Sequence, residues 1–227
     1  MPKHGKKYRA VKAKAENRLY ELEEAVTFLK ANRIASFDET AELHVRLGVD
    51  PKKTDQTVRG TVSLPHGTGK KVRVAVFASG AAADAAREAG ADVVGMDDLV
   101  EKVRGGWTDF DVAIATSEAM KTVRTLGKVL GPRGLMPNPK TGTVTDDTAA
   151  AVRQCKAGRV EFRMDRHGNV SVPFGKLSFD TKALVENAET VIAAIKAARP
   201  ASAKGVFLKR VTVTSTMGVG LRVNVRD

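Results

Sequence analysis

A short turn near the end of the chain carries the residues best suited to recognising another molecule. Ser215, Thr216, Met217 and Gly218 connect two segments in which valine alternates with polar residues, the pattern of strands with one buried face. Hydroxyls donate and accept hydrogen bonds, and glycines at 218 and 220 permit positive φ angles and expose backbone. Such a turn suits the minor groove of folded RNA, which displays 2′-hydroxyls and base edges. An ordinary hairpin with Met217 tucked into the core is the simpler interpretation of the turn alone.

Two further loops offer groups that fit a nucleic-acid partner. The segment Ser36–Thr40 holds Phe37, which either plugs the core or packs against a ribose or base. The segment Gly131–Gly142 is rich in proline and glycine and carries Arg133 and Lys140. Proline restricts this second loop while glycine allows sharp turns, so it is either a shaped, mildly basic RNA-facing loop or a rigid connection between helices.

Residues that could support catalysis or metal binding are scattered. None of the four histidines has metal-ligand spacing to another, and there is a single cysteine, so we expect no metal site. The segment Gly67–Lys71 resembles part of a phosphate-binding loop, but Leu64 and Lys71 stand where that motif needs Gly and Ser or Thr. The segment Phe77–Gly80 could bind an anion before a helix, although a plain strand-to-helix turn explains it as well. We therefore expect no enzyme activity and no cofactor.

The charge balance indicates a polyanionic partner. The 227 residues include 38 Lys and Arg against 26 Asp and Glu, a net charge of +12. That excess favours nucleic acid, and an aromatic content of 5% argues against broad stacking platforms for single strands. One cysteine, Cys155, fits a reducing cytosol, and no apolar run is long enough to span a membrane. We expect Met1–Ala15 to be a flexible basic tail that contacts phosphates.

Hydrophobic periodicity predicts a mixed α/β fold in two parts. Strands with one wet face are expected at 42–49, 58–64, 159–165 and 170–172, with helices at 17–33 and from 180 onward. Between them, dense apolar strands at 72–77, 91–95 and 110–116 alternate with helices at 81–89, 97–104, 118–130 and 146–156. This alternation is typical of a parallel sheet covered on both faces.

The simplest domain organisation is an α/β domain inserted into a discontinuous outer domain. We predict an outer domain of residues 1–67 and 159–227, an inserted domain of residues 68–158, and a hinge near 65–71 and 156–159. The inserted segment holds 13 basic and 11 acidic residues, a net +2, which leaves +10 on the remainder. The nucleic-acid site is therefore expected mainly on the outer domain.

Several segments in order along the chain resemble one family, that of the first-numbered (L-one) protein of the large ribosomal subunit, in its bacterial form. The most specific is the loop 131–145, which reads GPRGLMPNPKTGTVT. The others are MPKHGKKYR at 1–9, SFDETA at 36–41, RGTVSLPHG at 59–67, GRVEF at 158–162 and TMG at 216–218.

The resemblance implies a two-lobed fold and an RNA-binding role. One lobe would be a split βαβ sandwich made from both termini, and the other a Rossmann-like three-layer α/β insertion. Members of the family bind large-subunit ribosomal RNA, form the mobile stalk, and assist release of deacylated tRNA from the exit site. Several also repress translation by binding their own operon messenger. The chain is then expected to be cytoplasmic, part of the large ribosomal subunit, and a monomer off the ribosome.

The resemblance also assigns residues to the RNA site. It implies contacts from the loop around Phe37 and Thr40, the strand and turn near Arg163 and Arg166, and the turn Ser215–Gly218, with Arg133 and Lys140 as a secondary RNA-facing loop. Ser36 stands where the family often has Lys, so one phosphate contact is in question. Two other classes stay open on the residues alone: an α/β enzyme acting on a nucleotide, and a general DNA-binding protein, for which no recognition helix is evident.

Overall fold

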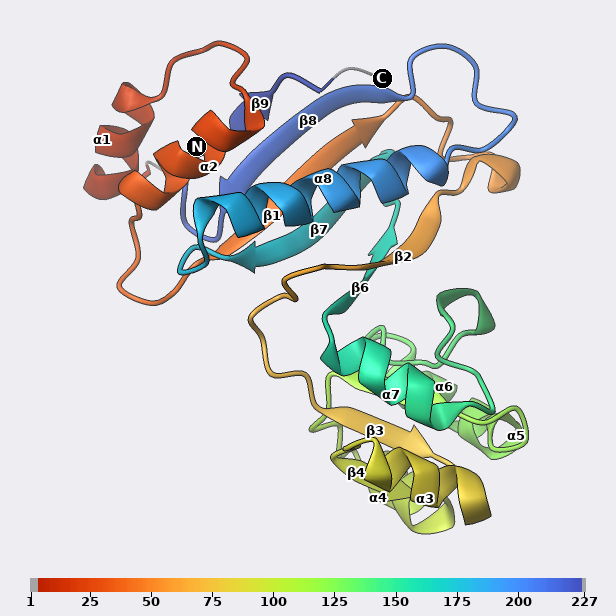
Figure 1. Cartoon of the computed structure of the whole chain (residues 1–227). Helices are drawn as coiled ribbons and strands as arrows, with labels where there is room; N and C mark the ends of the chain where they lie inside the picture. Colours follow the sequence, from red (N-terminus) through yellow and green to blue (C-terminus); the bar gives the residue numbers. More distant parts are fainter. Residues whose placement is uncertain (1–3, 226–227) are drawn as a thin grey trace. The chain divides into compact units, whose positions relative to one another are not determined.

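The computed structural model describes residues 4–225, apart from the side chain of Lys140. The chain divides into two compact units, each with its own core (Figure 1). The first unit joins Met1–Gly69 with Val160–Asp227, and the second is Lys70–Arg159. The predicted domain bounds and the hinge between the domains stay predictions.

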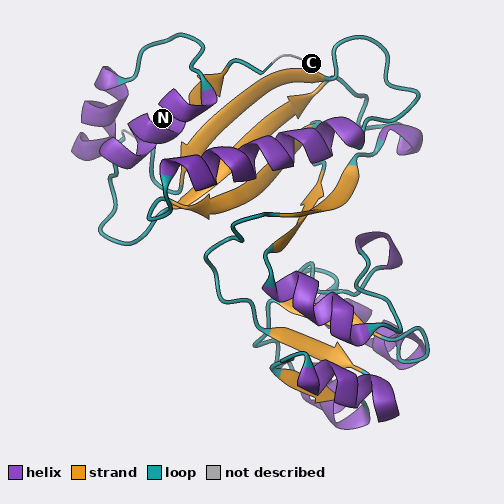
Figure 2. Cartoon of the chain, in the orientation of Figure 1, coloured by secondary structure: helices purple, strands orange, loops and turns teal. Residues whose placement is uncertain are grey.

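The first unit is built on a four-stranded antiparallel sheet. Its order is β7 (Asn169–Lys176), β1 (Thr40–Leu47), β8 (Leu208–Ser215) and β9 (Leu221–Val223). Helices α2 (Leu22–Ala31) and α8 (Thr181–Ala197) cover one face (Figure 2). Buried and less buried residues alternate along β1, because successive side chains of a strand point to opposite faces. The second face of the sheet is consequently polar.

A smaller sheet and a buried amide complete this unit. Strands β2 (Arg59–Ser63) and β6 (Arg159–Arg163) form a two-stranded sheet, and a 3-10 turn, η1, spans Thr54–Gln56. Helix α8 buries an apolar stripe with a single polar residue in it, Asn187. The Asn187 amide donates to the carbonyls of Phe174 and Gly67. These two bonds attach the helix to strand β7 and to the segment that follows β2.

The second unit is a three-layer α/β structure. Its parallel sheet has the order β4 (Val93–Gly95), β3 (Val74–Phe77) and β5 (Val112–Ala115). The helices are α3 (Gly80–Glu88), α4 (Asp97–Arg104), α5 (Met120–Val123), α6 (Gly127–Leu130) and α7 (Thr148–Lys156), with 3-10 turns η2 (Arg124–Leu126) and η3 (Pro139–Thr141). The two faces of β3 belong to two different apolar clusters, one with Val74 and Val76 and the other with Ala75 and Phe77. Burial on both faces explains why these strands are almost wholly apolar.

The N-terminal segment differs from its prediction. Residues 6–14 of the expected flexible tail form helix α1 (Lys6–Lys14), while Met1–Lys3 lie outside the described residues. Tyr8, Val11 and Ala15 are spaced at three and four residues, lie on one side of the helix and pack on the core of the first unit. In the sequence, the many basic residues around these three obscure their helical spacing.

Two predicted helices have different bounds. The helix expected at 17–33 begins only at Leu22, because Tyr20 forms a parallel bridge with Val223 and its N–H donates to the Arg222 carbonyl at 2.8 Å. Leu19, which the expected helix would place on its buried stripe, is 59% exposed. The single helix expected at 118–130 is divided into α5, η2 and α6, and the Thr125 hydroxyl in the middle of it bonds the Thr122 carbonyl.

Candidate nucleic-acid interface

A buried carboxylate joins the two loops that the sequence singled out in the first unit. The loop 32–39 follows α2, and the turn 215–218 follows β8. Glu39 is 0% exposed, and its carboxylate accepts four hydrogen bonds from these two segments. The donors are the N–H groups of Ile34 at 3.0 Å, Ala35 at 2.8 Å and Met217 at 3.1 Å, and the Ser215 hydroxyl at 2.5 Å. One side chain therefore sets the shape of both loops.

The ionisation of Glu39 is stabilised by these donors. Burial alone would raise the pKa of the Glu39 carboxyl, because desolvation disfavours the charged form. The hydrogen bonds from Ser215 and from the backbone of Ala35, Met217 and Ile34 outweigh burial and hold the pKa below its usual range. The carboxylate is thus a fixed anion inside the protein and is not offered to a partner.

Thr216 continues the pairing of β1 with β8 past the last residue of the strand. Its N–H donates to the Thr40 carbonyl at 3.1 Å, and its hydroxyl accepts from the Thr40 N–H at 3.0 Å. The Thr40 hydroxyl accepts in turn from the Lys176 ammonium at 2.8 Å. Lys176 also donates to the Asp38 carbonyl, so the three strands β7, β1 and β8 share one network at this end of the sheet.

Two large apolar side chains stand out from this rigid frame. Phe37 is 52% exposed and Met217 is 53% exposed. The alternative in which Phe37 plugs the core and Met217 tucks into it is therefore wrong. We call the residues Phe37, Thr40, Thr216, Met217 and Gly218 the loop–turn surface. It combines two exposed apolar groups with hydroxyls and backbone atoms on a preorganised support.

Ser215 supports this surface from inside the protein, and Gly218 allows the turn to pack closely on it. Ser215 is only 4% exposed and its hydroxyl is bound to Glu39, which favours a supporting role over the direct RNA contact that we predicted. A Cβ added at Gly218 would lie 2.3 Å from the Ser215 Oγ. Neither Gly218 nor Gly220 has a positive φ angle, so the prediction that the turn needs these glycines for positive φ was wrong. Gly218 is needed because there is no room for a side chain.

Arg163 and Arg166 are exposed but lie apart from the loop–turn surface. Arg163 ends β6, and Arg166 lies in the turn whose form is set by the Asp165 carboxylate, which accepts from the N–H groups of His167 and Asn169 at 2.8 Å each. In the pairing of β1 with β7, Thr40 is opposite Lys176 while Arg46 is opposite Asn169. The turn thus lies at the other end of β1, about 20 Å away for six residue steps of about 3.3 Å each.

The polar face of the sheet holds a hollow that lies along β1 toward the turn at 165–169. Its volume is about 580 Å³. The sequence predicted that this face of β1 is solvent-exposed, but it did not indicate a binding site there. Nδ1 of His44 lies 2.8 Å from the Ser171 Oγ, and the Arg46 guanidinium donates to the Asn169 side chain at 3.3 Å. Alternation of polar residues on strands that are not neighbours in sequence was the only signal for it. The lining residues are His44, Val45, Arg46, Asp165, Asn169, Ser171, Lys209, Arg210 and Thr212.

The proline- and glycine-rich loop belongs to the second unit and is internally braced. The Asn138 N–H donates to the Thr143 hydroxyl at 2.8 Å, and the Thr141 carbonyl accepts from the Arg159 guanidinium at 2.6 Å. Arg133 is exposed and hydrogen-bonded to the Thr108 hydroxyl. The side chain of Lys140 lies outside the described residues. The loop is a firm surface feature, which leaves the prediction of an RNA-facing role untested.

The described residues offer no metal-binding cluster. Within the range 4–225, no three His, Cys, Asp or Glu side chains gather closely enough to hold a metal ion. Burial raises the pKa of the Cys155 thiol, which keeps it protonated and unreactive. No helix in the described range has both the length and the apolar character needed to cross a membrane.

Comparisons with known proteins point in one direction. The profile of the Ribosomal protein L1p/L10e family matches residues 29–219. The chain is 53% identical to the large ribosomal subunit protein uL1 of Teredinibacter turnerae over 225 residues, 99% of this chain and 97% of that protein. It is 54% identical to the protein of the same name from Methylobacillus flagellatus over 220 residues, 96% of each chain.

Proposed function

The chain belongs to the Ribosomal protein L1p/L10e family, and from this we propose that it is a structural constituent of the large ribosomal subunit that binds large-subunit ribosomal RNA. A ribosomal-protein family has a structural role, so the protein is not an enzyme. The observation that carries the RNA-binding proposal is the buried Glu39, which holds an apolar and polar surface in one shape and turns two large apolar side chains outward.

The proposed mechanism is shape recognition without chemistry. Exposed Phe37 and Met217 would pack on ribose or base surfaces, while the Thr40 and Thr216 hydroxyls and the backbone carbonyls of the turn would bond 2′-hydroxyls. Each such hydrogen bond contributes about 0.5–1.5 kcal/mol net, and an RNA partner left unpaired costs about 1–3 kcal/mol. Preorganisation by Glu39 reduces the ordering cost of binding, because the turn does not have to be fixed when the RNA arrives.

The cations add a second, less selective contribution. Arg163 and Arg166, together with the excess positive charge of the chain, would neutralise phosphates and release counterions. The loop with Arg133 and Lys140 is a secondary candidate on the other unit. Binding through these residues is expected to weaken steeply with salt, whereas the contacts of the loop–turn surface decide which RNA is preferred.

The finer role that we propose is that of the mobile stalk. In this role the protein holds a folded helix-and-loop region of the ribosomal RNA, assists release of deacylated tRNA from the exit site, and represses translation by binding a similar fold in its own operon messenger. Two compact units that are joined by two chain segments support a hinged structure of this kind. On this proposal the protein works in the cytoplasm as part of the ribosome and is a monomer when it is free.

A filter-binding experiment tests the RNA proposal. The full chain is titrated with a transcript of the helix-and-loop region of large-subunit ribosomal RNA and with a transcript of scrambled sequence. We expect a clear preference for the first, which Met217→Asp abolishes while Lys140→Ala leaves it nearly intact. Equal binding of both transcripts by the wild-type chain would refute the proposal. In a thermal shift panel, stabilisation by a nucleotide and not by the transcript would favour the enzyme alternative.

A further inference from the structure

Helix α1 carries a concentration of positive charge for which the fold alone offers no use. Five of its nine residues are basic, none is acidic, and all five basic side chains are exposed. Cations three and four residues apart on a helix repel each other and weaken it. A helix of this composition is suited to binding a polyanion, because the negative charges of the partner relieve the repulsion between its cations. The basic residues are Lys6, Lys7, Arg9, Lys12 and Lys14.

The cations are aimed away from the protein by the packing of the helix. Tyr8, Val11 and Ala15 lie against the core of the first unit. At about 3.6 residues per turn these three share one side, and the basic residues fill the remaining arc. His4 stacks on Tyr8 with ring centroids 4.4 Å apart, which extends the packed side by one turn beyond the start of the helix.

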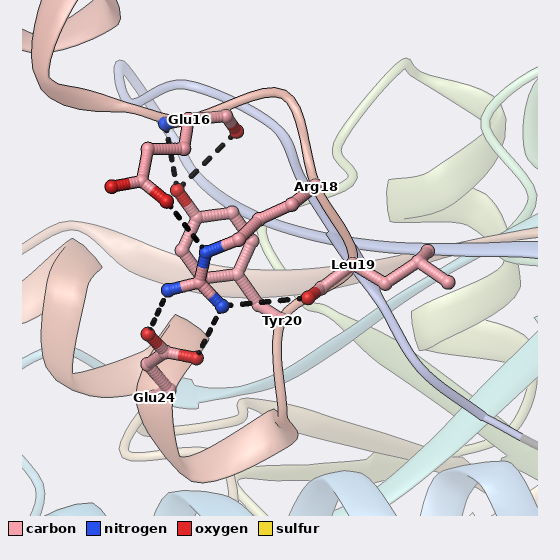
Figure 3. Close-up of polar contacts among 5 residues, drawn as sticks. All are labelled: Glu16, Arg18, Leu19, Tyr20 and Glu24. Carbon is pink, nitrogen blue, oxygen red and sulfur yellow. Dashed lines mark hydrogen bonds and ion pairs between the residues drawn. The ribbon is translucent and has the colours of Figure 1, made fainter.

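The link between α1 and α2 holds the helix in place (Figure 3). The Arg18 guanidinium bonds the Glu24 carboxylate of α2 through both terminal nitrogens and the Glu16 carboxylate through Nε. It also lies 4.2 Å from the centre of the Tyr20 ring, whose hydroxyl accepts from the Glu16 N–H at 2.8 Å. Glu16 and Glu24 are thus paired with Arg18 and not with the basic residues of α1. These basic side chains can therefore interact with a partner.

The far end of α1 adjoins the loop that carries Phe37. The Lys14 ammonium donates to the Asn32 side chain at 3.5 Å, and Asn32 is the residue at which α2 ends and the loop 32–39 begins. The Asn32 amide in turn bonds the Phe28 carbonyl of α2. The last turn of this cationic helix thus contacts the first residue of the loop that carries Phe37.

We propose that the exposed face of α1 is a further RNA-binding site, which takes phosphate groups of the same RNA that occupies the loop–turn surface. This rests on the proposed function and adds to it a place for the RNA backbone outside the specific contacts. Contacts of lysine and arginine with phosphate groups read no bases, so this contribution is independent of sequence and sensitive to salt.

Charge neutralisation with a matched control tests the proposal. The control carries the same loss of four charges on exposed helical residues of the second unit, and glutamine is used because it forms helices about as well as lysine. Both variants are compared with the wild-type full chain in filter binding from low to high salt. The α1 variant is Lys6→Gln, Lys7→Gln, Arg9→Gln and Lys12→Gln, and the control is Lys102→Gln, Lys121→Gln, Arg124→Gln and Lys128→Gln.

The slope of binding against salt gives the decisive reading. With the helix-and-loop transcript, the α1 variant should flatten the slope of log K against log salt by roughly 3, at about 0.7–0.9 for each phosphate that is no longer neutralised. The control should change it by less than about 1, and the preference over the scrambled transcript should be kept by both. An α1 variant that is folded by circular dichroism but has an unchanged slope, or one equal to the control, overturns the proposal.

Lysine protection in the wild-type chain supplies a second measurement that needs no variant. Acetylation with and without the transcript, read by mass spectrometry, should show protection of Lys6, Lys7 and Lys12 but not of Lys121 and Lys128. Equal labelling of the two groups contradicts the α1 site. If the wild-type chain does not prefer the ribosomal transcript, the proposed function fails. If it does and α1 is unprotected, only this inference fails.

Discussion

At the scale of single residues, the chain places an ionised carboxylate where an apolar side chain would be expected. Burial of an unpaired charge is costly, and Glu39 is tolerated because four donors surround it. The arrangement makes the loop–turn surface depend on one internal residue that no partner touches. A substitution of Glu39 should therefore change the affinity for RNA indirectly, by altering the shape of the loop–turn surface.

Replacing Glu39 with glutamine tests this dependence. The amide keeps the size of the side chain but has only one acceptor oxygen, so the donors of Ser215 and Met217 or those of Ile34 and Ala35 lose their partner. We expect Glu39→Gln to lower the free energy of unfolding by about 1–3 kcal/mol in urea denaturation. Affinity for the ribosomal transcript should fall with it. Unchanged stability and affinity would show that the network has no structural role.

The same network predicts a pH dependence with a defined sign. Because the pKa of Glu39 is lowered in the folded protein, its stabilising contribution is complete above the ordinary glutamate pKa of about 4.3 and is lost as the pH falls through the folded-state pKa. The stability difference between wild type and Glu39→Gln should thus be largest near neutral pH and shrink in acid. The control is Glu189→Gln, which removes an exposed carboxylate from α8 and leaves the Glu39 network intact.

Gly218 offers a steric test of the same site. An alanine Cβ would lie 2.3 Å from the Ser215 Oγ, so Gly218→Ala must displace either the turn or the bond of Ser215 to Glu39. We expect a lower midpoint in urea and a loss of RNA preference. Gly127→Ala is the matched control, because nothing lies within 4 Å of its added Cβ and the backbone there is helical. A control as harmful as Gly218→Ala would contradict the steric explanation.

At the scale of elements, helix α1 depends on a junction more than on its own propensity. Isolated helices of this length are marginal, and its like charges weaken it further. Its order comes from three packed side chains and from the Arg18 cluster that fixes the link to α2. The hydrogen bonds to Glu24 and Glu16 raise the pKa of the Arg18 guanidinium, a group that is charged at any working pH in proteins.

Removal of the guanidinium should loosen α1 selectively. In Arg18→Met, which keeps the apolar stem, we expect faster amide hydrogen exchange across residues 6–14 while the sheet strands keep their protection. Arg87→Met is the control, since Arg87 is also exposed and pairs with an acid, Asp84, within a single helix. If amide exchange in α1 is no faster in Arg18→Met than in Arg87→Met, the three packed side chains alone hold the helix in place.

At the scale of the whole molecule, the excess positive charge and the residues proposed to bind RNA lie in the discontinuous unit. The loop–turn surface, Arg163, Arg166 and α1 all belong to it, and the inserted segment is close to neutral. The parallel-sheet unit resembles an enzyme scaffold, yet its described residues hold no group of side chains that could bind a metal ion. A fold suited to catalysis is thus no guide to function here, and the residues of the site decide it.

Deleting the inserted unit tests whether the main RNA site lies on the first unit. A chain in which a short Gly/Ser linker replaces residues 70–159 should fold, as judged by circular dichroism. It should bind the ribosomal transcript within about tenfold of the full chain, a difference of about 1.4 kcal/mol. A folded deletion variant that loses several orders of magnitude in affinity would move the main RNA site to the second unit.

Local patterns accounted for much of the fold and for part of the site. Alternation predicted β1 and the β8 strand, an apolar stripe predicted α8 from Asp180, and the dense apolar runs predicted the parallel strands β3 and β5. The start of α2 and the break between α5 and α6 were missed. These depend on a bridge to Val223 and on local side-chain bonding, which override helix periodicity.

The sequence by itself determined the family resemblance, the excess of positive charge and the identity of the two loops, because composition and short-range spacing are properties of the chain alone. Only the tertiary structure decided that Phe37 and Met217 face outward, that Ser215 faces inward, and that Arg166 lies at the far end of the sheet. The physical reason is that Glu39 and Ser215 are 176 residues apart and meet only when β1 pairs with β8. An interaction of that range leaves no periodic trace in the sequence.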